Sequence, residues 1–285
     1  MSSTRTMFRI TLGVLTTLLL RKINAFVPPA SIEFGGYQRG DLKPVSIELN
    51  AVPNSIFTSG KDVNDIKLQI EDEIKSTKRG RKASPDQRTK IDSLVQSLET
   101  LCPYEEPARM PEMEGKWIVD YTTAPPPSNG KLGPFDGIAR QIIDLDKRTY
   151  TNYLSVPGEI EKEFLGAKLE ATFEEWDGEL LKDDRISDSI EGNDNEDKVL
   201  QNAGEKQSTQ QNIDLTPDYG ANCWKVDFKT LTIKLFGFKV LEKSFDEGTS
   251  RVWKMSYLDQ DGTRVVRAGR TGKDEDAMLF YMTKE

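Results

Sequence analysis

The 285-residue sequence contains no histidine and only two cysteines, Cys102 and Cys223. The missing histidine excludes Ser-His-Asp triads and cysteine–histidine nucleophiles, and it removes the usual axial ligand of haem. Two thiols without an imidazole do not complete a tetrahedral zinc site. Two cysteines do not build a disulfide framework either, so one bond between them and two separate buried thiols both stay open.

Long apolar runs are equally scarce, because no run after Leu20 is long enough to span a bilayer as a helix. Residues 1–25 combine two early arginines with a short apolar core and then a small residue, which is typical of a secretory signal peptide. Residues 26–55 contain scattered prolines and glycines without helical or strand periodicity. We interpret residues 26–55 as a disordered, transit-peptide-like segment.

The charge balance is acidic, with 39 basic and 47 acidic residues and a net charge of −8. Residues 1–25 hold four bases and no acid, so the rest of the chain is more acidic still. Non-specific nucleic-acid binding depends on lysine and arginine that displace phosphate counterions. We therefore expect no nucleic-acid partner.

Two helices are predicted in the first third of the remaining chain. Isoleucines at 66, 70 and 74 recur at helical spacing after Val63. A second helix begins at Ser84, where Pro85 suits the first helical position and Gln87 completes a capping box. Residues 75–90 between the helices carry seven basic residues and one acid. This segment is either a solvated loop or a docking patch for a membrane surface or an acidic partner.

From Gly115 onward the apolar residues alternate with polar ones, so that Trp117, Val119 and Tyr121 are expected to point one way. Many short alternating runs separated by turn residues predict an antiparallel barrel or sandwich. Residues 177–219 are a long polar, acidic insertion between strands. We divide residues 56–285 into a helical lead-in, 56–108, and a β-barrel, 109–285, that contains this insertion.

The most telling motif is Gly115-Lys116-Trp117 at the entry to the first strand. In small barrels such an entry places the indole across the closed end, where an arginine from the last strands covers it by cation–π attraction. Arg264 and Arg267 are both candidates for that partner. An ordinary core tryptophan is the alternative interpretation.

The wider context resembles the plastid lipid-associated protein family, also called plastid fibrillins. Residues 115–123, GKWIVDYTT, follow Glu114 and are similar to the family's "G-x-W-x-L-x-Y-T-T" block. Residues 137–144 resemble its next strand, and residues 257–269, YLDQDGTRVVRAG, resemble its C-terminal block. The resemblance covers about residues 64–176 and 221–285. The acidic insertion and the extra Gly262-Thr263 depart from the family pattern.

The resemblance implies a mainly β protein, a lipocalin-like antiparallel β-barrel preceded by two α-helices. It further implies a non-catalytic protein without a cofactor that binds carotenoids, prenylquinones or acyl lipids, at plastoglobules, thylakoids or in the stroma. The Ala25-Phe26 junction resembles the two-part presequence of plastids that arose from a eukaryotic endosymbiont. An ordinary secreted protein is the alternative.

An apolar cargo gains about 25 cal/mol for each Å² that a dry barrel removes from water. The expected barrel lining consists of aromatic residues together with one cation that could meet a carbonyl or headgroup oxygen: Trp117, Tyr121, Phe173, Phe228, Trp253, Tyr257 and Arg267. The same inner positions must be filled in any barrel, so plain core packing is the alternative role for each of them.

Two further hypotheses compete with a binding barrel. An enzyme would use carboxylates such as Asp120 or Asp144, although Asp259 and Asp261 are better interpreted as a turn than as an acid–base pair. A structural coat on plastid lipid particles would use the basic segment 75–90 and the acidic insertion to bind its partners.

Overall fold

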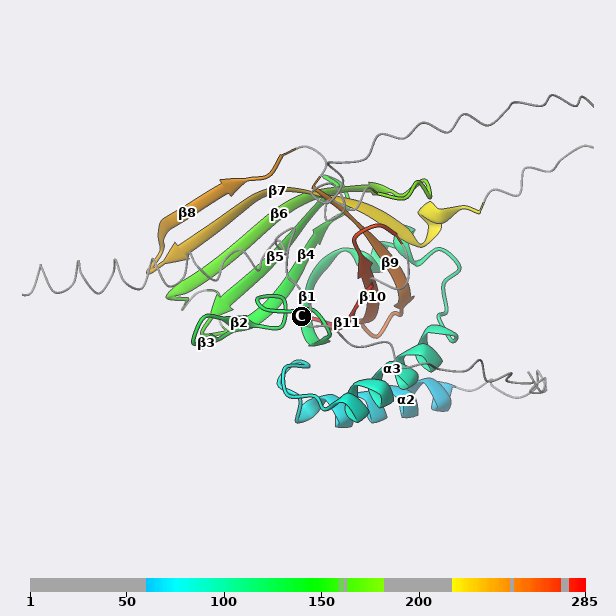
Figure 1. Cartoon of the computed structure of the whole chain (residues 1–285). Helices are drawn as coiled ribbons and strands as arrows, with labels where there is room; N and C mark the ends of the chain where they lie inside the picture. Colours follow the sequence, from blue (N-terminus) through cyan, green and yellow to red (C-terminus); the bar gives the residue numbers. More distant parts are fainter. Residues whose placement is uncertain (1–59, 159, 161–162, 182–216, 247–248, 273–276) are drawn as a thin grey trace, which may run out of the picture.

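The computed structural model describes residues 60–158, 160, 163–181, 217–246, 249–272 and 277–285. It confirms the predicted class, because the described part is mainly β and two helices precede the sheet (Figure 1). The strands in chain order are β1 (Gly115–Thr122), β2 (Lys131–Leu132), β3 (Phe135–Asp136), β4 (Ile138–Asp144), β5 (Thr149–Val156), β6 (Leu165–Glu175), β7 (Cys223–Leu235), β8 (Phe238–Ser244), β9 (Ser250–Leu258), β10 (Thr263–Gly269) and β11 (Met278–Lys284).

The large sheet is antiparallel and rolls into a ring in the order β6-β5-β4-β1-β11-β10-β9-β7, with β6 also pairing with β7. The length of β7 makes this arrangement possible. Its first part, Cys223–Asp227, pairs with β9, and its last part, Thr230–Leu235, pairs with β8. The far ends of β5, β6 and β7 therefore extend past the ring and, with β8, form an open flap (Figure 1).

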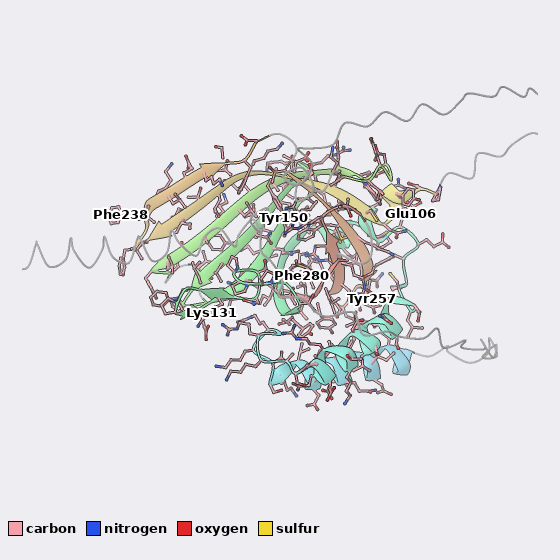
Figure 2. All side chains as sticks on the ribbon, viewed as in Figure 1. Glu106, Lys131, Tyr150, Phe238, Tyr257 and Phe280 are labelled. Atoms are coloured by element: carbon pink, nitrogen blue, oxygen red, sulfur yellow. The ribbon has the colours of Figure 1, made fainter. Side chains whose placement is uncertain are left out.

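The interior of the ring is a single apolar core to which every ring strand contributes. Alternation along each strand places one set of side chains inside, as the period of two predicts. Figure 2 shows side chains on both faces of the strands, with Tyr150 and Phe280 near the middle of the sheet. The buried aromatic members of the interior are Trp117, Tyr150, Phe173, Trp224, Phe228, Trp253 and Phe280.

The helices α2 (Gly60–Lys75) and α3 (Pro85–Glu99) cover the outer face of β1, β9, β10 and β11 (Figure 1). Helix α3 begins as predicted. The Gln87 backbone N–H donates to Ser84 Oγ at 3.1 Å, and the Ser84 N–H donates to the Gln87 side chain at 3.2 Å. Two 3-10 turns, η1 (Pro107–Arg109) and η2 (Pro111–Met113), then lead into β1. Ile70, Ile91, Val95 and Leu98 are fully buried on the helical side of this contact.

Two β-bulges change which face the later residues of β1 and β9 occupy. The register of β1 against β11 shifts between Val119 and Tyr121, so Asp120 is an extra residue. The register of β9 against β10 shifts in the same way, and Ser256 is the extra residue there. A bulge inserts one residue into a period of two, so the side chains after it change face. Tyr121 and Tyr257 therefore lie under the helices.

The basic segment 75–90 contacts the protein itself. Arg79 donates to the carbonyl of Gly137 at 3.0 Å, and Arg81 pairs with Asp136 on β3 at 2.5 Å. Arg88 donates to the carbonyls of Ala83 and Gly80. Arg79 and Arg81 thus fasten the segment to the neighbouring loop, and Arg88 holds the segment together, so these three of its seven cations have partners within the protein.

The predicted signal peptide 1–25, the transit-like segment 26–55 and most of the insertion 177–219 lie outside the described residues. Within the described part, residues 177–181 follow β6, and residues 217–222 lead through the 3-10 turn η5 (Tyr219–Ala221) into β7. No helix in the described part of the chain is long and apolar enough to cross a membrane. The division into 56–108 and 109–285 stays a prediction.

Candidate functional site

Trp117 lies in the interior core of the ring, and an arginine covers its indole as the glycine–x–tryptophan motif predicts. Its side chain is fully buried, and its Nε1–H donates to the Met113 carbonyl at 3.0 Å. The guanidinium carbon of Arg264 lies 4.6 Å from the indole centroid, and Lys284 Nζ lies 5.3 Å from it. The arginine left open by the sequence is therefore Arg264. It lies two residues before Val266 and faces the interior like that residue, whereas Arg267, the residue after Val266, faces the helices.

Arg264 is a buried cation whose described partners include no carboxylate. It is 1% exposed, and it donates to Gln141 Oε1 and towards Met282 Sδ. Burial lowers the pKa of Arg264 to about 9 because desolvation penalises the charged form. Within the described part of the chain, Arg264 Nε, Gln141 Nε2 and Trp253 Nε1 find no acceptor. The interior therefore contains several buried hydrogen-bond donors, two of them on the contacting pair Arg264 and Gln141.

Aromatic contacts fill the rest of the interior. Trp253 lies between Tyr150 and Phe280, with centroid distances of 4.8 and 5.7 Å. Phe173 stacks on Trp224 at 4.0 Å with an interplanar angle of 15°. The Trp224 Nε1–H donates to the Ala108 carbonyl at 3.1 Å, so η1 closes this part of the core. Among the described residues, these packed aromatic side chains occupy much of the interior.

The seven residues predicted to line the barrel thus divide into two groups. Trp117, Phe173, Phe228 and Trp253 lie in the interior core.

The expected inner position of Tyr121, Tyr257 and Arg267 is wrong. The two bulges turn the tyrosines outward, where Tyr257 donates to Asp259 at 2.8 Å. Arg267 follows the regular alternation of β10 to the outer face. There it donates to Glu99 at 2.7 Å and to Asp92 at 3.0 Å on α3.

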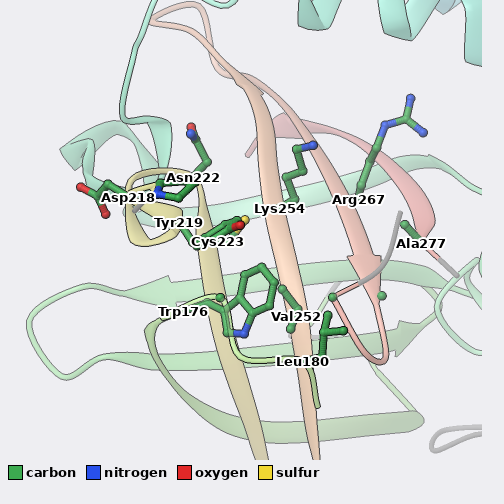
Figure 3. Close-up of a pocket in the computed structure, with 14 residues that line it drawn as sticks. Trp176, Leu180, Asp218, Tyr219, Asn222, Cys223, Val252, Lys254, Arg267 and Ala277 are labelled. Atoms are coloured by element: carbon green, nitrogen blue, oxygen red, sulfur yellow. The ribbon is translucent and has the colours of Figure 1, made fainter. Parts of the chain in front are cut away.

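A hollow of about 510 Å³ lies on the outer wall of the ring (Figure 3). It lies beside the start of β9, at Val252 and Lys254, and the end of β10, at Arg267 and Gly269. Its lining includes outward residues of the ring, Cys223, Val252 and Arg267. Its sides come from the two ends of the insertion, with Trp176 just before it, Leu180 near its start and Tyr219 at its last position. The Trp176 and Tyr219 rings are 5.2 Å apart. The hollow is therefore largely apolar, with a cationic rim.

Backbone and ionic contacts hold the walls of this hollow together. The Trp176 N–H donates to the Cys223 carbonyl at 3.0 Å, and the Trp176 Nε1–H donates to the Glu179 carbonyl at 2.9 Å. Arg109 on η1 contacts Glu175 at 2.6 Å and Asp218 at 2.7 Å. The Arg109 guanidinium lowers the pKa of both carboxyls. One side chain therefore joins the two points where the insertion leaves the sheet and returns.

The carboxylates considered for catalysis have structural surroundings. Asp144 accepts from the Lys147 backbone and side chain in the β4–β5 turn. Asp259 accepts from the Thr263 N–H at 2.9 Å and pairs with Lys67, which agrees with its predicted place in a turn. Asp120 accepts from Thr283 Oγ1 at 2.7 Å at the bulge of β1. Among the described residues, no three acidic or cysteine side chains gather to hold a metal ion.

Comparison with known proteins decides the family. The model of the family PAP_fibrillin matches residues 64–207, which is half of the chain. The chain belongs to the plastid fibrillin family. "Probable plastid-lipid-associated protein 5, chloroplastic" from Arabidopsis thaliana is 36% identical over 59 residues. That match covers 21% of this fibrillin and 25% of the relative, so the chain aligns with only a quarter of the relative's length.

Sequence reasoning missed the hollow of this fibrillin. Its walls are separated by the insertion in the sequence, and no motif links Trp176 to Tyr219. One signal was available, because Trp176 directly follows the strand run that ends at Glu175, at the edge of the polar insertion. A large aromatic residue at such a boundary indicates that the chain there packs against something.

Proposed function

We propose that this fibrillin is a non-catalytic plastid protein that binds hydrophobic small molecules and carries or sequesters them at plastoglobules or thylakoids. Carotenoids, prenylquinones and acyl lipids are the proposed cargo classes. Membership of the fibrillin family supports this proposal, as does the name of the Arabidopsis relative, which describes that protein as chloroplastic and lipid-associated. The absence of histidine is consistent with a binding role.

The observation that carries the proposal is the hollow beside β9, and we place the cargo there rather than inside the ring. Its volume of about 510 Å³ lies in the usual range for small-molecule sites. Leu180 and Tyr219 in its walls are 53% and 41% exposed, so two large apolar side chains face solvent in the same hollow. A cargo that covers them removes apolar surface from water at about 2.5 kcal/mol per 100 Å².

The rim gives the cargo an orientation. Lys254 and Arg267 both line the hollow, Arg267 while it is paired with Glu99 and Asp92, and Figure 3 shows both side chains on the same side of it. Cations at one edge of an apolar site suit a molecule with an oxygen function at one end and an apolar body. Arg267 is the one residue of the predicted binding set that lines the hollow.

Leu180→Asp tests this placement, because it puts a charge on the exposed wall without disturbing a buried side chain. Leu68→Asp on α2 is the matched control, since Leu68 is 62% exposed and belongs to another surface. Titration with a plastoquinone analogue or a carotenoid, followed by quenching of Trp176 fluorescence, should show binding by the parent and Leu68→Asp proteins. Leu180→Asp should bind at least about tenfold more weakly, because a buried unpaired charge is costly. Equal binding by all three proteins contradicts the placement.

We also propose that residues 1–25 and 26–55 direct the protein to a complex plastid through the secretory route. A fluorescent protein fused after residue 55 should reach the plastid. The same fusion with Phe26→Ala should stop short of the plastid stroma. Secretion of the parent fusion would support the alternative of an ordinary secreted protein.

A second candidate function is a structural coat on plastid lipid particles. The observation that favours it is an exposed apolar hairpin tip, remote from the hollow, which contains Phe236 and Phe238.

A further inference from the structure

The hairpin between β7 and β8 exposes three large apolar side chains. Phe236, Phe238 and Val240 are 60%, 76% and 40% exposed. Together with the two in the hollow, they account for five of the six exposed large apolar residues in the described part of the chain. Figure 2 shows Phe238 at the outer end of the flap, pointing away from the ribbon. The molecule therefore has two separate exposed apolar surfaces, and this hairpin tip is the larger of them by residue count.

The backbone of the tip is also unusual. Leu235 pairs with Phe238, so Phe236 and Gly237 form a two-residue turn, with φ angles of 51° and 79°. Such a turn favours asparagine followed by glycine, because both positions require the left-handed region. A bulky aromatic residue there costs free energy, and Phe236 recovers little by burial. Its ring has a tilted contact with Phe164 at 5.9 Å. An unfavourable residue kept exposed points to a function outside the fold.

The charge around the tip is opposite to that of the protein. Residues 229–243 hold four lysines and one glutamate, whereas the whole chain has a net charge of −8. Lys229, Lys234, Lys239 and Lys243 are all exposed. The glutamate, Glu242, pairs with Lys239 at 2.7 Å. The tip is thus an apolar point whose own hairpin is cationic on an acidic molecule, while Glu163 precedes the Phe164 that contacts it on the neighbouring hairpin.

We propose that this tip inserts its phenylalanines into the surface of a lipid layer that carries anionic headgroups. Aromatic side chains favour the boundary between headgroups and acyl chains, and lysines around them attract anionic lipid. The long lysine stems keep their charges at the headgroup level while the rings go deeper. The tip would thus be the surface through which this fibrillin docks on lipid. This role does not depend on the cargo hollow.

A second copy of the chain fits the tip less well. Strand β8 is the edge strand of the flap, so it has free backbone groups for another strand. Lysines on such an edge prevent pairing between identical chains, because two copies bring the same positive charges together. Anionic lipid instead neutralises them. The lysines therefore favour the lipid surface over self-association.

The tip and the hollow lie at opposite ends of one strand. Strand β7 starts at Cys223 in the hollow and ends at Leu235 beside the tip. Thirteen strand residues span about 40 Å. Docking through the tip therefore leaves the mouth of the hollow away from the lipid contact, and the two sites can be tested separately.

The direct test places a reporter at the tip of the full-length chain. Phe238→Trp, mixed with phosphatidylcholine vesicles that contain phosphatidylglycerol and a doxyl-labelled lipid, should show quenched and blue-shifted emission. Leu68→Trp, at another highly exposed position on α2, should stay unquenched. The four native tryptophans are buried and give a common background. Unquenched Phe238→Trp in vesicle-bound protein overturns the proposal.

Two matched sets of variants separate the apolar and ionic parts. Phe236→Asn with Phe238→Ser introduces a favourable turn residue at 236, so the hairpin should still form, and it should lower vesicle partitioning at least about tenfold. Lys239→Glu with Lys243→Glu should lower partitioning onto anionic vesicles by a similar factor at low salt. At high salt the same pair of substitutions should have only a weak effect, because salt screens the lysine charges. Lys78→Glu with Lys82→Glu makes the same charge change in the basic segment 75–90 and should have no effect.

Other outcomes are equally decisive. If the tip variants partition like the parent, or if the variant at 78 and 82 is the one that fails, the tip is not the docking surface. If the parent forms dimers that Phe238→Ser dissociates, and binds no vesicles, the tip is a contact between copies. The tip variants should bind cargo like the parent, whereas Leu180→Asp should lose cargo and keep vesicle binding. Failure of one site is therefore distinguishable from failure of the other.

Discussion

Replacement of Trp117 should destabilise the fold more than that of any other interior aromatic residue. The indole is fully buried, donates to the Met113 carbonyl and lies under the Arg264 guanidinium. Loss of a buried tryptophan side chain costs about 3–5 kcal/mol. Trp117→Ala also uncovers a buried cation whose described partners include no carboxylate, so we expect a value near the top of that range. Trp117→Phe retains most of the area and should lose about 2 kcal/mol.

Urea denaturation followed by circular dichroism measures these free energies of unfolding. A double-mutant cycle with Arg264→Met isolates the cation–π contact, and its coupling energy should be about 1–2 kcal/mol. The reasoning is refuted if Trp117→Ala unfolds within about 1 kcal/mol of the parent protein. It is also refuted if the two substitutions are additive, because the guanidinium and the indole would then not interact.

Two further perturbations test the contacts between the helices and the ring. Burial raises the pKa of Asp120 above its ordinary 3.8, because desolvation outweighs the hydrogen bond from Thr283. The folded state then binds the proton more tightly, so the ionised carboxyl destabilises the protein at neutral pH. Asp120→Asn should therefore be the more stable protein at pH 7. That advantage should disappear as the pH falls through the raised pKa towards 3.8, because the carboxyl is then protonated in both states. A difference in the free energy of unfolding that stays the same at every pH would contradict this prediction. Lys67 on α2 is 8% exposed and pairs with the buried carboxylate of Asp259. Lys67→Met should cost about 3 kcal/mol because it leaves that charge buried, and adding Asp259→Asn should restore part of the loss. If the Lys67→Met protein has the same melting temperature as the parent, the ion pair between Lys67 and Asp259 does not stabilise the contact between α2 and the ring.

The sequence predicts the local features of this fold well. The start of α3 is encoded by three residues, Ser84, Pro85 and Gln87, whose hydrogen bonds depend on nothing distant. The alternating strands and the buried tryptophan of the first strand follow from a period of two. These signals are strong because each depends on neighbours in the chain.

The predictions fail where one extra residue alters that period. Asp120 and Ser256 carry no local mark of a bulge, and each bulge is visible only against the partner strand. Tyr121 and Tyr257 are therefore placed on the wrong face by alternation alone. Alternation alone also leaves the choice between Arg264 and Arg267 open. Which of the two faces the interior depends on the residue at which β10 begins after the turn at Asp259.

Both proposed sites escape sequence reasoning for a different reason. The hollow depends on Trp176, Tyr219 and Val252, which only the closed ring brings together. The hairpin tip does have a local signal, a Phe-Gly pair between two alternating runs, which predicts a tight turn. Its exposure follows from the position of β8 at the edge of the flap, and this is a property of the whole sheet.

The central claim is that this fibrillin holds a hydrophobic molecule in the hollow on the outer wall of its ring. The most direct measurement is mass analysis of the small molecules that stay bound after incubation with total plastid lipid and native purification. The account predicts a stoichiometric carotenoid, quinone or galactolipid on the parent and Leu68→Asp proteins, and its loss from Leu180→Asp. A folded parent protein that retains no molecule, or a Leu180→Asp protein that retains the same load, would contradict it.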